Sequence, residues 1–430
     1  MTIADIKRLN HIKYTAFRNY FKSSKSIGSY LFSYLIRVPW HLLHWKKDAL
    51  EMNEILVVVP TINNQKSVRT ILEHLPEDKC AIWGSEWRER MPWPKIEFLS
   101  LFYMPLFIGL YFSSSNADKQ LIRDFFYEFI TTCATFKVLE KALARNRQLK
   151  MVVMANDHIL LTRCLVELAE KHHIKSLYVQ HASVTESFPP LRFDYSFLDG
   201  QESFEKYKKI GSMKGKAFLS GSPRFDDFLN YEREKTYDVG VALNELDSVQ
   251  KALDLCLYLK DNYTDKVIVR PHPEMLVNGM FKEELFSSHG IAISNPINDL
   301  SYVFISDIKM MIANESGIHL DAAMMGVPSI LFNFSDSKVL DWYSYIKKGL
   351  VKKCNSYEEV KEMLCVQPTA PVDVVRYYAA SYNTPTNGKI GEMIAEFIKK
   401  ILFESETDGE KYISNFMDWR SDHYEYKSQE

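Results

Sequence analysis

The sequence predicts an α/β protein built from two Rossmann-like domains, and three observations lead to this fold class. The chain has 430 residues, which is too long for one ordinary core and about right for two α/β domains. Apolar residues make up 46% of it and charged residues 25%, so two sizeable cores can be buried. From residue 54 onward, short β-branched runs alternate with amphipathic segments of helix length, which is typical of βαβ units and parallel sheets.

The first alternating set ends near residue 221. We expect its strands at 54–60, 80–84, 150–156, 175–181, 195–200 and 217–221. Its helices are expected at 65–75, 119–147 (one long helix or a pair), 158–173 and 202–210.

The pattern restarts after the charged stretch 231–235. Strands are expected at 237–243, 266–270, 291–294, 309–313, 328–332 and 350–354, and helices at 247–262, 317–325, 338–348, 356–365 and 390–402. The simplest layout has a hinge near 205–236. It gives an arm over 1–48, an N-terminal domain over 49–215, a C-terminal domain over 216–403 and a tail or helix over 404–430.

The N-terminal arm is strongly basic. Residues 1–47 hold nine Lys/Arg and one acid, Asp5, with aromatic residues interleaved among them. This pattern suits an anionic membrane surface; the alternative is a helical arm packed on its own protein or on a partner. The apolar stretches 27–45 and 98–112 are interrupted or shorter than the roughly 20 residues that span a bilayer. Without a secretory signal, we expect a cytoplasmic protein, peripheral at the inner face of the plasma membrane.

Composition and missing motifs exclude several classes. The net charge of −2 argues against a nucleic-acid-binding protein. The sequence lacks the P-loop, the GxGxxG fingerprint and HExxH, which disfavours P-loop NTPases, dinucleotide oxidoreductases and zinc peptidases. Six cysteines show neither a CxxC pair nor a Cys/His metal spacing, and this fits a reducing compartment. No cofactor is expected; a divalent ion stays open, although no DxD triplet suggests one.

Polar clusters follow the expected strands of the second domain. Arg270 and His272 lie in Arg-Pro-His-Pro directly after a strand, where the prolines fix a tight exit that suits a phosphate or a leaving-group oxyanion. Ser316 and Gly317 open an expected helix, whose free N–H groups suit a phosphate. In the same cluster, Glu315 is a candidate for ribose hydroxyls and Asp321 for orienting the loop. Simple N-capping by Ser316 is the alternative.

The first domain and the hinge carry further candidates. His181 ends a strand and is a candidate base for an acceptor hydroxyl, or alternatively a structural strand-end histidine. Asp157, with His158 beside it, and Glu186 are weaker candidates for the same role. At the hinge, Arg224 is a candidate phosphate ligand, and Asp226 would anchor it. The alternative is that this segment is only a structural turn.

In this order, the clusters resemble bacterial capsule, lipopolysaccharide and teichoic-acid transferases of the GT-B fold. The resemblance covers about 150–335. It rests on Gln180-His181-Ala182, Gly221-Ser222-Pro223-Arg224-Phe225-Asp226, the Arg270–Pro273 motif, Ser316, Asp321 and the Gly-x-Pro of 326–328 with the strand after it. Ala182 replaces the usual Gly, and Asn314-Glu315-Ser316 replaces the family's paired-Ser or Asp-Tyr-Ser-Ser loop. The resemblance implies two Rossmann-like domains with parallel sheets facing a cleft, a base at His181, and donor phosphate held by the His-Pro and Ser loops.

The function expected from these residues is sugar transfer with inversion. The donor would be a nucleotide-activated sugar, with CMP-activated Kdo or sialic acid favoured, and the acceptor a growing surface glycan or glycolipid. The motifs leave open a CDP-polyol phosphotransferase of the teichoic-acid type, a sugar-nucleotide epimerase of the same fold, and a non-catalytic scaffold.

Overall fold

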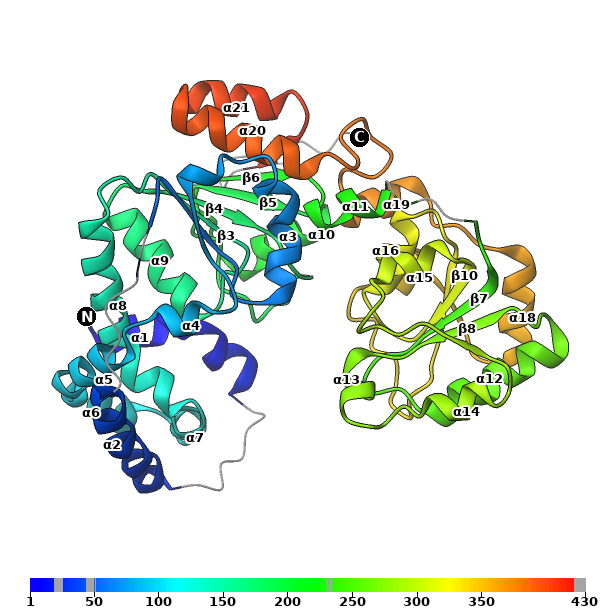
Figure 1. Ribbon diagram of the computed structural model, residues 1–430, viewed down its shortest axis with the longest axis horizontal. Coiled ribbons are helices and arrows are strands. Elements are labelled where there is room, and N and C mark those ends of the chain that lie inside the picture. Colours follow the sequence, from blue (N-terminus) through cyan, green and yellow to red (C-terminus); the bar gives the residue numbers. More distant parts are fainter. Residues whose placement is uncertain (19–25, 44–49, 51, 230, 232–233, 421–430) are drawn as a thin grey trace. The chain divides into compact units, whose positions relative to one another are not determined.

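The computed structural model describes residues 1–18, 26–43, 50, 52–229, 231 and 234–420 (Figure 1). The chain forms two compact units, Met1–Pro223 with Gly391–Glu430, and Arg224–Ile390. The division after residue 223 lies eight residues beyond the expected boundary at 215/216. Residues 391–403, which we expected in the second domain, belong to the first unit.

The first unit contains a seven-stranded sheet in the order β13-β6-β5-β4-β3-β1-β2. All neighbours are parallel except β13, which pairs antiparallel with β6. Every residue of β1, β3 and β5 is buried, as expected for a parallel sheet covered on both faces. The strands are β1 (Ile55–Val58), β2 (Cys80–Trp83), β3 (Met151–Met154), β4 (Lys175–Val179), β5 (Tyr195–Leu198), β6 (Lys216–Leu219) and β13 (Asp418–Arg420).

The helices of the first unit surround this sheet, and an N-terminal helical group extends from it (Figure 1). The segment expected at 119–147 is a helix pair that breaks at Phe125. Phe397 packs edge-on against the aromatic rings of β5 and β6, which explains why the C-terminal helix joins the first unit. The helices are α1 (Ile3–Leu9), the π-helix η1 (Lys13–Phe17), α2 (Ile27–Leu43), α3 (Ile62–Leu72), η2 (Glu77–Lys79), α4 (Trp87–Arg90), α5 (Trp93–Phe102), α6 (Met104–Ser113), α7 (Asn116–Asp124), α8 (Phe126–Arg145), α9 (Leu160–Lys171), α10 (Gln201–Ile210), α20 (Ile390–Phe403) and α21 (Glu406–Ser414).

The second unit contains a six-stranded parallel sheet in the order β12-β11-β10-β7-β8-β9, which is the Rossmann order. Its strands are β7 (Tyr237–Ala242), β8 (Val267–Arg270), β9 (Ala292–Ile293), β10 (Ile308–Ala313), β11 (Ser329–Phe332) and β12 (Lys352–Cys354). Its helices are η3 (Pro223–Phe225), α11 (Asp226–Leu229), α12 (Val249–Asn262), α13 (Pro273–Val277), α14 (Glu283–Ser287), α15 (Ser301–Ser306), α16 (Ile318–Met324), α17 (Tyr345–Lys348), α18 (Tyr357–Val366) and α19 (Val372–Tyr378). The prediction of two Rossmann-like domains with parallel sheets is confirmed.

The helix expected at 338–348 is wrong over most of its length. Only Tyr345–Lys348 is helical, because Asp341 and Ser344 have φ values of 54° and 56°, which a right-handed helix does not allow. The Asp341 carboxylate instead accepts hydrogen bonds from the N–H groups of Ile346 and Lys347.

The start of the basic arm packs on its own unit. Helix α1 contacts α6, α8 and α9. Arg8 pairs with Asp5 and with Glu167, and Arg18 pairs with Asp118 at 3.2 Å. Four of the nine basic positions (22, 25, 46 and 47) lie outside the described residues. For residues 1–18, the alternative of an arm packed on its own protein therefore fits better than a free basic face.

In the described part of the chain, no single helix has the length and apolar character needed to cross a membrane. Helices α5 and α6 satisfy that test only as a pair, and they are bent by 67°.

Candidate functional site

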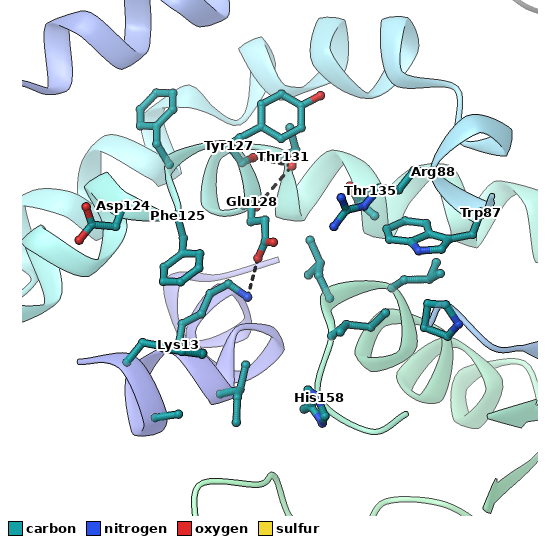
Figure 2. A pocket seen from close by; sticks show the side chains of 18 of the residues that line it. Lys13, Trp87, Arg88, Asp124, Phe125, Tyr127, Glu128, Thr131, Thr135 and His158 are labelled. Atoms are coloured by element: carbon teal, nitrogen blue, oxygen red, sulfur yellow. Dashed lines mark hydrogen bonds and ion pairs between the residues drawn. The ribbon is translucent and has the colours of Figure 1, made fainter. Parts of the chain in front are cut away.

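The first unit holds a cavity of about 1210 Å³, which we call the arm cavity (Figure 2). Its wall includes Pro60 and Thr61, just beyond β1, and His158, just beyond β3. The remaining wall comes mainly from η1, α2, α4 and the start of α8. The strand order of this sheet reverses between β1 and β3, and ligands of doubly wound folds bind beyond the carboxyl ends of strands at such a switch point.

A carboxylate–imidazole pair follows β3 at this point. His158 Nδ1 lies 3.0 Å from Asp157 Oδ1, and the other Asp157 oxygen accepts a 2.6 Å hydrogen bond from the Tyr207 hydroxyl. The turn is fixed by Asn156, whose side-chain oxygen accepts from the N–H groups of His158 and Ile159 at 3.0 Å each. The pair thus has a fixed orientation, and its imidazole lines the arm cavity.

The Asp157 carboxyl is buried, with 2% of its surface exposed. Burial by itself acts to raise its pKa, but the hydrogen bonds from His158 and Tyr207 and the nearby His181 outweigh this and lower the pKa below its usual value. Asp157 is therefore an anion at neutral pH, as a group that orients an imidazole and stabilises its protonated form must be.

His181 belongs to the same cluster. It follows β4, and its ring centroid lies 5.6 Å from that of His158. Burial lowers the pKa of His181 to about 4, although the Asp157 anion acts in the opposite direction, so the ring is neutral at pH 7. Its Nδ1 is buried without a hydrogen-bond partner among the described residues, and His181 does not line the arm cavity.

Gln180 and Glu186 flank His181 in very different settings. Gln180 is buried and holds the loop, donating to the Ala182 carbonyl and the Ser203 hydroxyl and accepting from the Asp199 N–H. Glu186 is exposed, and in the described part of the chain it forms neither a hydrogen bond nor an ion pair with the Asp157 cluster. The structure therefore brings Asp157, His158 and His181 together and leaves Glu186 apart.

In the second unit, Arg270 and His272 follow β8 with different environments. The Arg270 guanidinium is buried and donates to Ser294 Oγ and the Asp299 carbonyl at 2.7 Å each. Burial lowers its pKa to about 10. Through these two hydrogen bonds Arg270, the last residue of β8, holds the loop that follows β9 against the end of β8. His272 is partly exposed and caps α13 through Nδ1, which accepts from the Glu274 N–H at 3.3 Å.

The loop after β10 is held from several sides. Ser316 Oγ accepts from the Ile318 N–H at 3.4 Å, and Gly317 occupies the N-cap position of α16. No atom lies within 4 Å of the position where a Cβ of Gly317 would stand, so there is open space at the start of α16. The Glu315 carboxylate accepts from the N–H groups of Leu340 and Trp342, and therefore holds the loop after β11.

Arg224 and Asp321 form an ion pair at 3.2 Å. The Asp226 carboxylate, which the sequence suggests as the anchor of Arg224, also accepts from the Ile390 N–H at 3.0 Å. Asp321 therefore ties η3 to α16, a long-range pairing that sequence spacing does not reveal.

A network that the sequence reasoning missed lies at the switch point of the second sheet, between β7 and β10. Asn314 donates to Asp247 Oδ1 at 2.6 Å and to Asn333 Oδ1 at 3.3 Å. Burial raises the pKa of Asp247, which is 4% exposed. The only sequence signal was that Asn244, Asn314 and Asn333 each follow an expected strand. In the described residues, no group of three or more His, Cys, Asp or Glu side chains is placed to hold a metal ion.

His319 stands behind this network and should make the second unit sensitive to acid. Its ring contacts Ser329 Oγ at 3.1 Å and the Asn314 carbonyl at 3.0 Å, and burial lowers its pKa to about 4. In the unfolded chain the pKa of this histidine is near 6.5. The stabilisation of the second unit that depends on neutral His319 should therefore be fully present above pH 6.5 and be lost as the pH falls towards 4. We expect a loss of about 2 kcal/mol from this residue between pH 7 and pH 5. Denaturant titrations of His319→Gln should show a smaller difference between these pH values than wild type; an equal difference would contradict the assignment.

The sequence matches no protein-family model and no curated protein. Among solved structures, the chain is similar to the UDP-GlcNAc 2-epimerase of Methanocaldococcus jannaschii, with 15% identity over 80% of this chain and 99% of that one, and a TM-score of 0.50. It is also similar to the UDP-GlcNAc 2-epimerase of Neisseria meningitidis bound to UDP-GlcNAc, with 13% identity over 82% of this chain and 100% of that one, and a TM-score of 0.50. The chain has the GT-B fold.

Proposed function

We propose that this protein transfers a sugar from a nucleotide-activated donor to a hydroxyl group of a glycan or glycolipid acceptor. The observation that carries the proposal is the Asp157–His158 pair, which faces a large cavity at the switch point of the first sheet. The polar loops at the switch point of the second sheet are suited to a nucleotide, since Rossmann-type sheets bind nucleotides there. The GT-B structures cited above are similar in fold, and one of them holds a nucleotide sugar.

In this proposal, His158 takes the proton from the acceptor hydroxyl, and Asp157 orients the imidazole and stabilises it once protonated. The acceptor oxygen forms a bond to the anomeric carbon as the bond from that carbon to the donor phosphate breaks, which inverts the configuration. His181, which we expected as the base from sequence, is the alternative proton acceptor of the same cluster.

The leaving nucleotide phosphate carries the developing negative charge. We assign its stabilisation to His272, to the Ser316 hydroxyl and to the N–H groups beside Gly317, where there is open space. Arg270 and Asp321 act as positioning residues, because their charged groups are engaged with Ser294, Asp299 and Arg224. Glu315 and Arg224, expected from the sequence to contact the nucleotide, are engaged in the same way with the N–H groups of Leu340 and Trp342 and with Asp321, so we assign them positioning roles as well.

A thermal-shift screen against CMP, CDP, UDP, GDP and their sugars tests the proposal, because a ligand that binds only the folded state raises the melting temperature. We expect a CMP-activated sugar to give the largest shift. A CDP-polyol in first place would favour phosphopolyol transfer, and the absence of any shift would contradict the proposed function.

We propose that α2 makes the membrane contact expected for the arm. Its exposed side chains include Phe32, Ile36 and Leu43, which are 67%, 56% and 82% exposed. Replacing all three with Ser should weaken binding to anionic vesicles at least tenfold, because inserting each side chain is worth about 1.5–3 kcal/mol. Co-sedimentation with vesicles measures this. The matched control replaces Leu246, Val277 and Leu340 of the second unit, whose side chains are similarly exposed, at 77%, 71% and 61%. Equal binding by the α2 variant and the control would contradict the assignment.

A further inference from the structure

The arm cavity has an aromatic lining that extends well beyond the Asp157–His158 pair. Trp87, Trp93, Phe125, Tyr127 and Phe188 all line it. The faces of aromatic rings carry partial negative charge and attract the slightly positive C–H groups of a sugar ring. The volume of about 1210 Å³ exceeds the roughly 300–1,000 Å³ of ordinary small-molecule pockets, so more than one sugar unit fits.

Two polar atoms in the lining have no partner among the described residues. Thr135 is 3% exposed, and its Oγ1 is buried without a hydrogen bond. Oδ2 of Asp124 is likewise buried without a hydrogen bond. Buried polar atoms in proteins are nearly always hydrogen-bonded, so these two atoms are suited to pair with the hydroxyls of a bound ligand.

The charged groups of the lining are not balanced. Lys13 and Glu128 neutralise one another in an ion pair at 2.5 Å, which crosses the centre of Figure 2. Arg37 and Arg88 also line the cavity, and neither guanidinium forms an ion pair with any described residue. Their recorded contacts are with ring faces, Arg37 over Tyr127 at 5.6 Å and Arg88 over Trp87 at 5.5 Å.

The two sides of the cavity therefore differ in charge. Trp87 and Arg88 lie on the side opposite Asp124 and Phe125, with His158 at the third side (Figure 2). A guanidinium presents paired N–H donors that match a carboxylate or a phosphate. A ligand with an anionic group at Arg88 and hydroxyls near Thr135, which lies beside Arg88, and near Asp124 across the cavity satisfies these groups (Figure 2).

We infer that the arm cavity binds the end of an anionic oligosaccharide, with Arg37 and Arg88 contacting its carboxylate or phosphate and the aromatic rings stacking on its sugars. This inference rests on the proposed function, because it makes the bound oligosaccharide the acceptor whose hydroxyl meets His158. It also gives the N-terminal arm a role in specificity, since Arg37 comes from α2.

Calorimetric titration of the full chain without donor tests the inference with three probes. The probes are a tetrasaccharide ending in a uronic acid, the same tetrasaccharide after reduction of its carboxyl group, and one ending in a hexose phosphate. We expect at least one acidic probe to bind roughly tenfold tighter than the neutral one. The better of the two acidic probes identifies the anionic group as a carboxylate or a phosphate.

Arg37→Ala and Arg88→Ala should each weaken the acidic probe roughly five- to tenfold and leave the neutral probe within about twofold. Arg90→Ala is the matched control, because Arg90 also belongs to α4 but pairs with Glu86 at 3.2 Å and does not line the cavity. Equal affinity for acidic and neutral probes, no binding of any probe, or equal effects of Arg88→Ala and Arg90→Ala would overturn the inference. If one of these outcomes is observed while a nucleotide still raises the melting temperature, the inference about the arm cavity is wrong but the proposed function is not. If an acidic probe binds but no nucleotide raises the melting temperature, the proposed function is wrong but the inference about the arm cavity is not.

Discussion

His158→Ala is expected to reduce the rate of sugar transfer by about 10²–10⁴-fold, the usual contribution of a general base. His158 is the imidazole that lines the arm cavity, and Asp157 holds it at 3.0 Å. Because it lies in the first unit, its loss should leave the affinity for the donor nucleotide near wild type. Single-turnover assays measure the rate, and calorimetric titration with the nucleotide measures the affinity.

His181→Ala is the matched comparison, since both histidines belong to one cluster and only His158 lines the cavity. We expect the His181 variant to retain more activity than the His158 variant. The reverse order would make His181 the base, as the sequence alone suggested. Loss of nucleotide binding in both variants would place the donor in the first unit and contradict the assignment of domains.

His272→Ala is expected to weaken nucleotide binding by roughly 1.5–3 kcal/mol, the range for a hydrogen bond to a charged group. The partly exposed imidazole just beyond β8 is the candidate hydrogen-bond donor to the phosphate in its loop, because the neighbouring Arg270 is engaged with Ser294 and Asp299. Calorimetric titration with the donor nucleotide measures the change in affinity.

The His272 ring also caps α13, so a second variant must separate the cap from the phosphate contact. Asn is a good capping residue, and His272→Asn should therefore keep the fold while losing affinity. His289→Ala, at an exposed histidine of the same unit, serves as the control and should bind nucleotide as wild type does. Unchanged affinity in both His272 variants would rule out the phosphate contact.

The strands of both sheets were predictable because parallel strands covered on both faces leave continuous apolar runs, as in β1 and β3. The positions of Asp157, His181, His272 and Ser316 at strand ends followed from the same pattern. Long-range pairings did not follow. Two examples are the Tyr207–Asp157 hydrogen bond, which fixes the catalytic candidate, and the Arg224–Asp321 ion pair. Each joins residues about fifty to a hundred positions apart, and a single sequence carries no signal for such pairs.

Short elements set by local geometry were also beyond sequence reasoning. Strand β13 has only three residues and pairs antiparallel with β6 at the edge of the sheet, so it is too short for a hydrophobic period to predict it. The positive φ at Asp341 and Ser344 ended an otherwise helix-compatible run. The sequence ranks His158 below His181 as the candidate base. The reason is that the neighbours of His158 in the sequence do not reveal the arm cavity, which is built largely from the N-terminal arm and α8.

In the proposed reaction a sugar leaves its nucleotide and joins an acceptor hydroxyl. The most direct measurement follows a doubly labelled donor, with ¹⁴C in the transferred group and ³²P in the phosphate attached to it, in a single turnover with and without acceptor. Sugar transfer predicts that ¹⁴C appears in the acceptor, that ³²P stays with the released nucleotide, and that neither moves without acceptor. Both labels in the acceptor would mean phosphopolyol transfer, and conversion of the donor sugar without acceptor would mean epimerisation; either result would contradict sugar transfer.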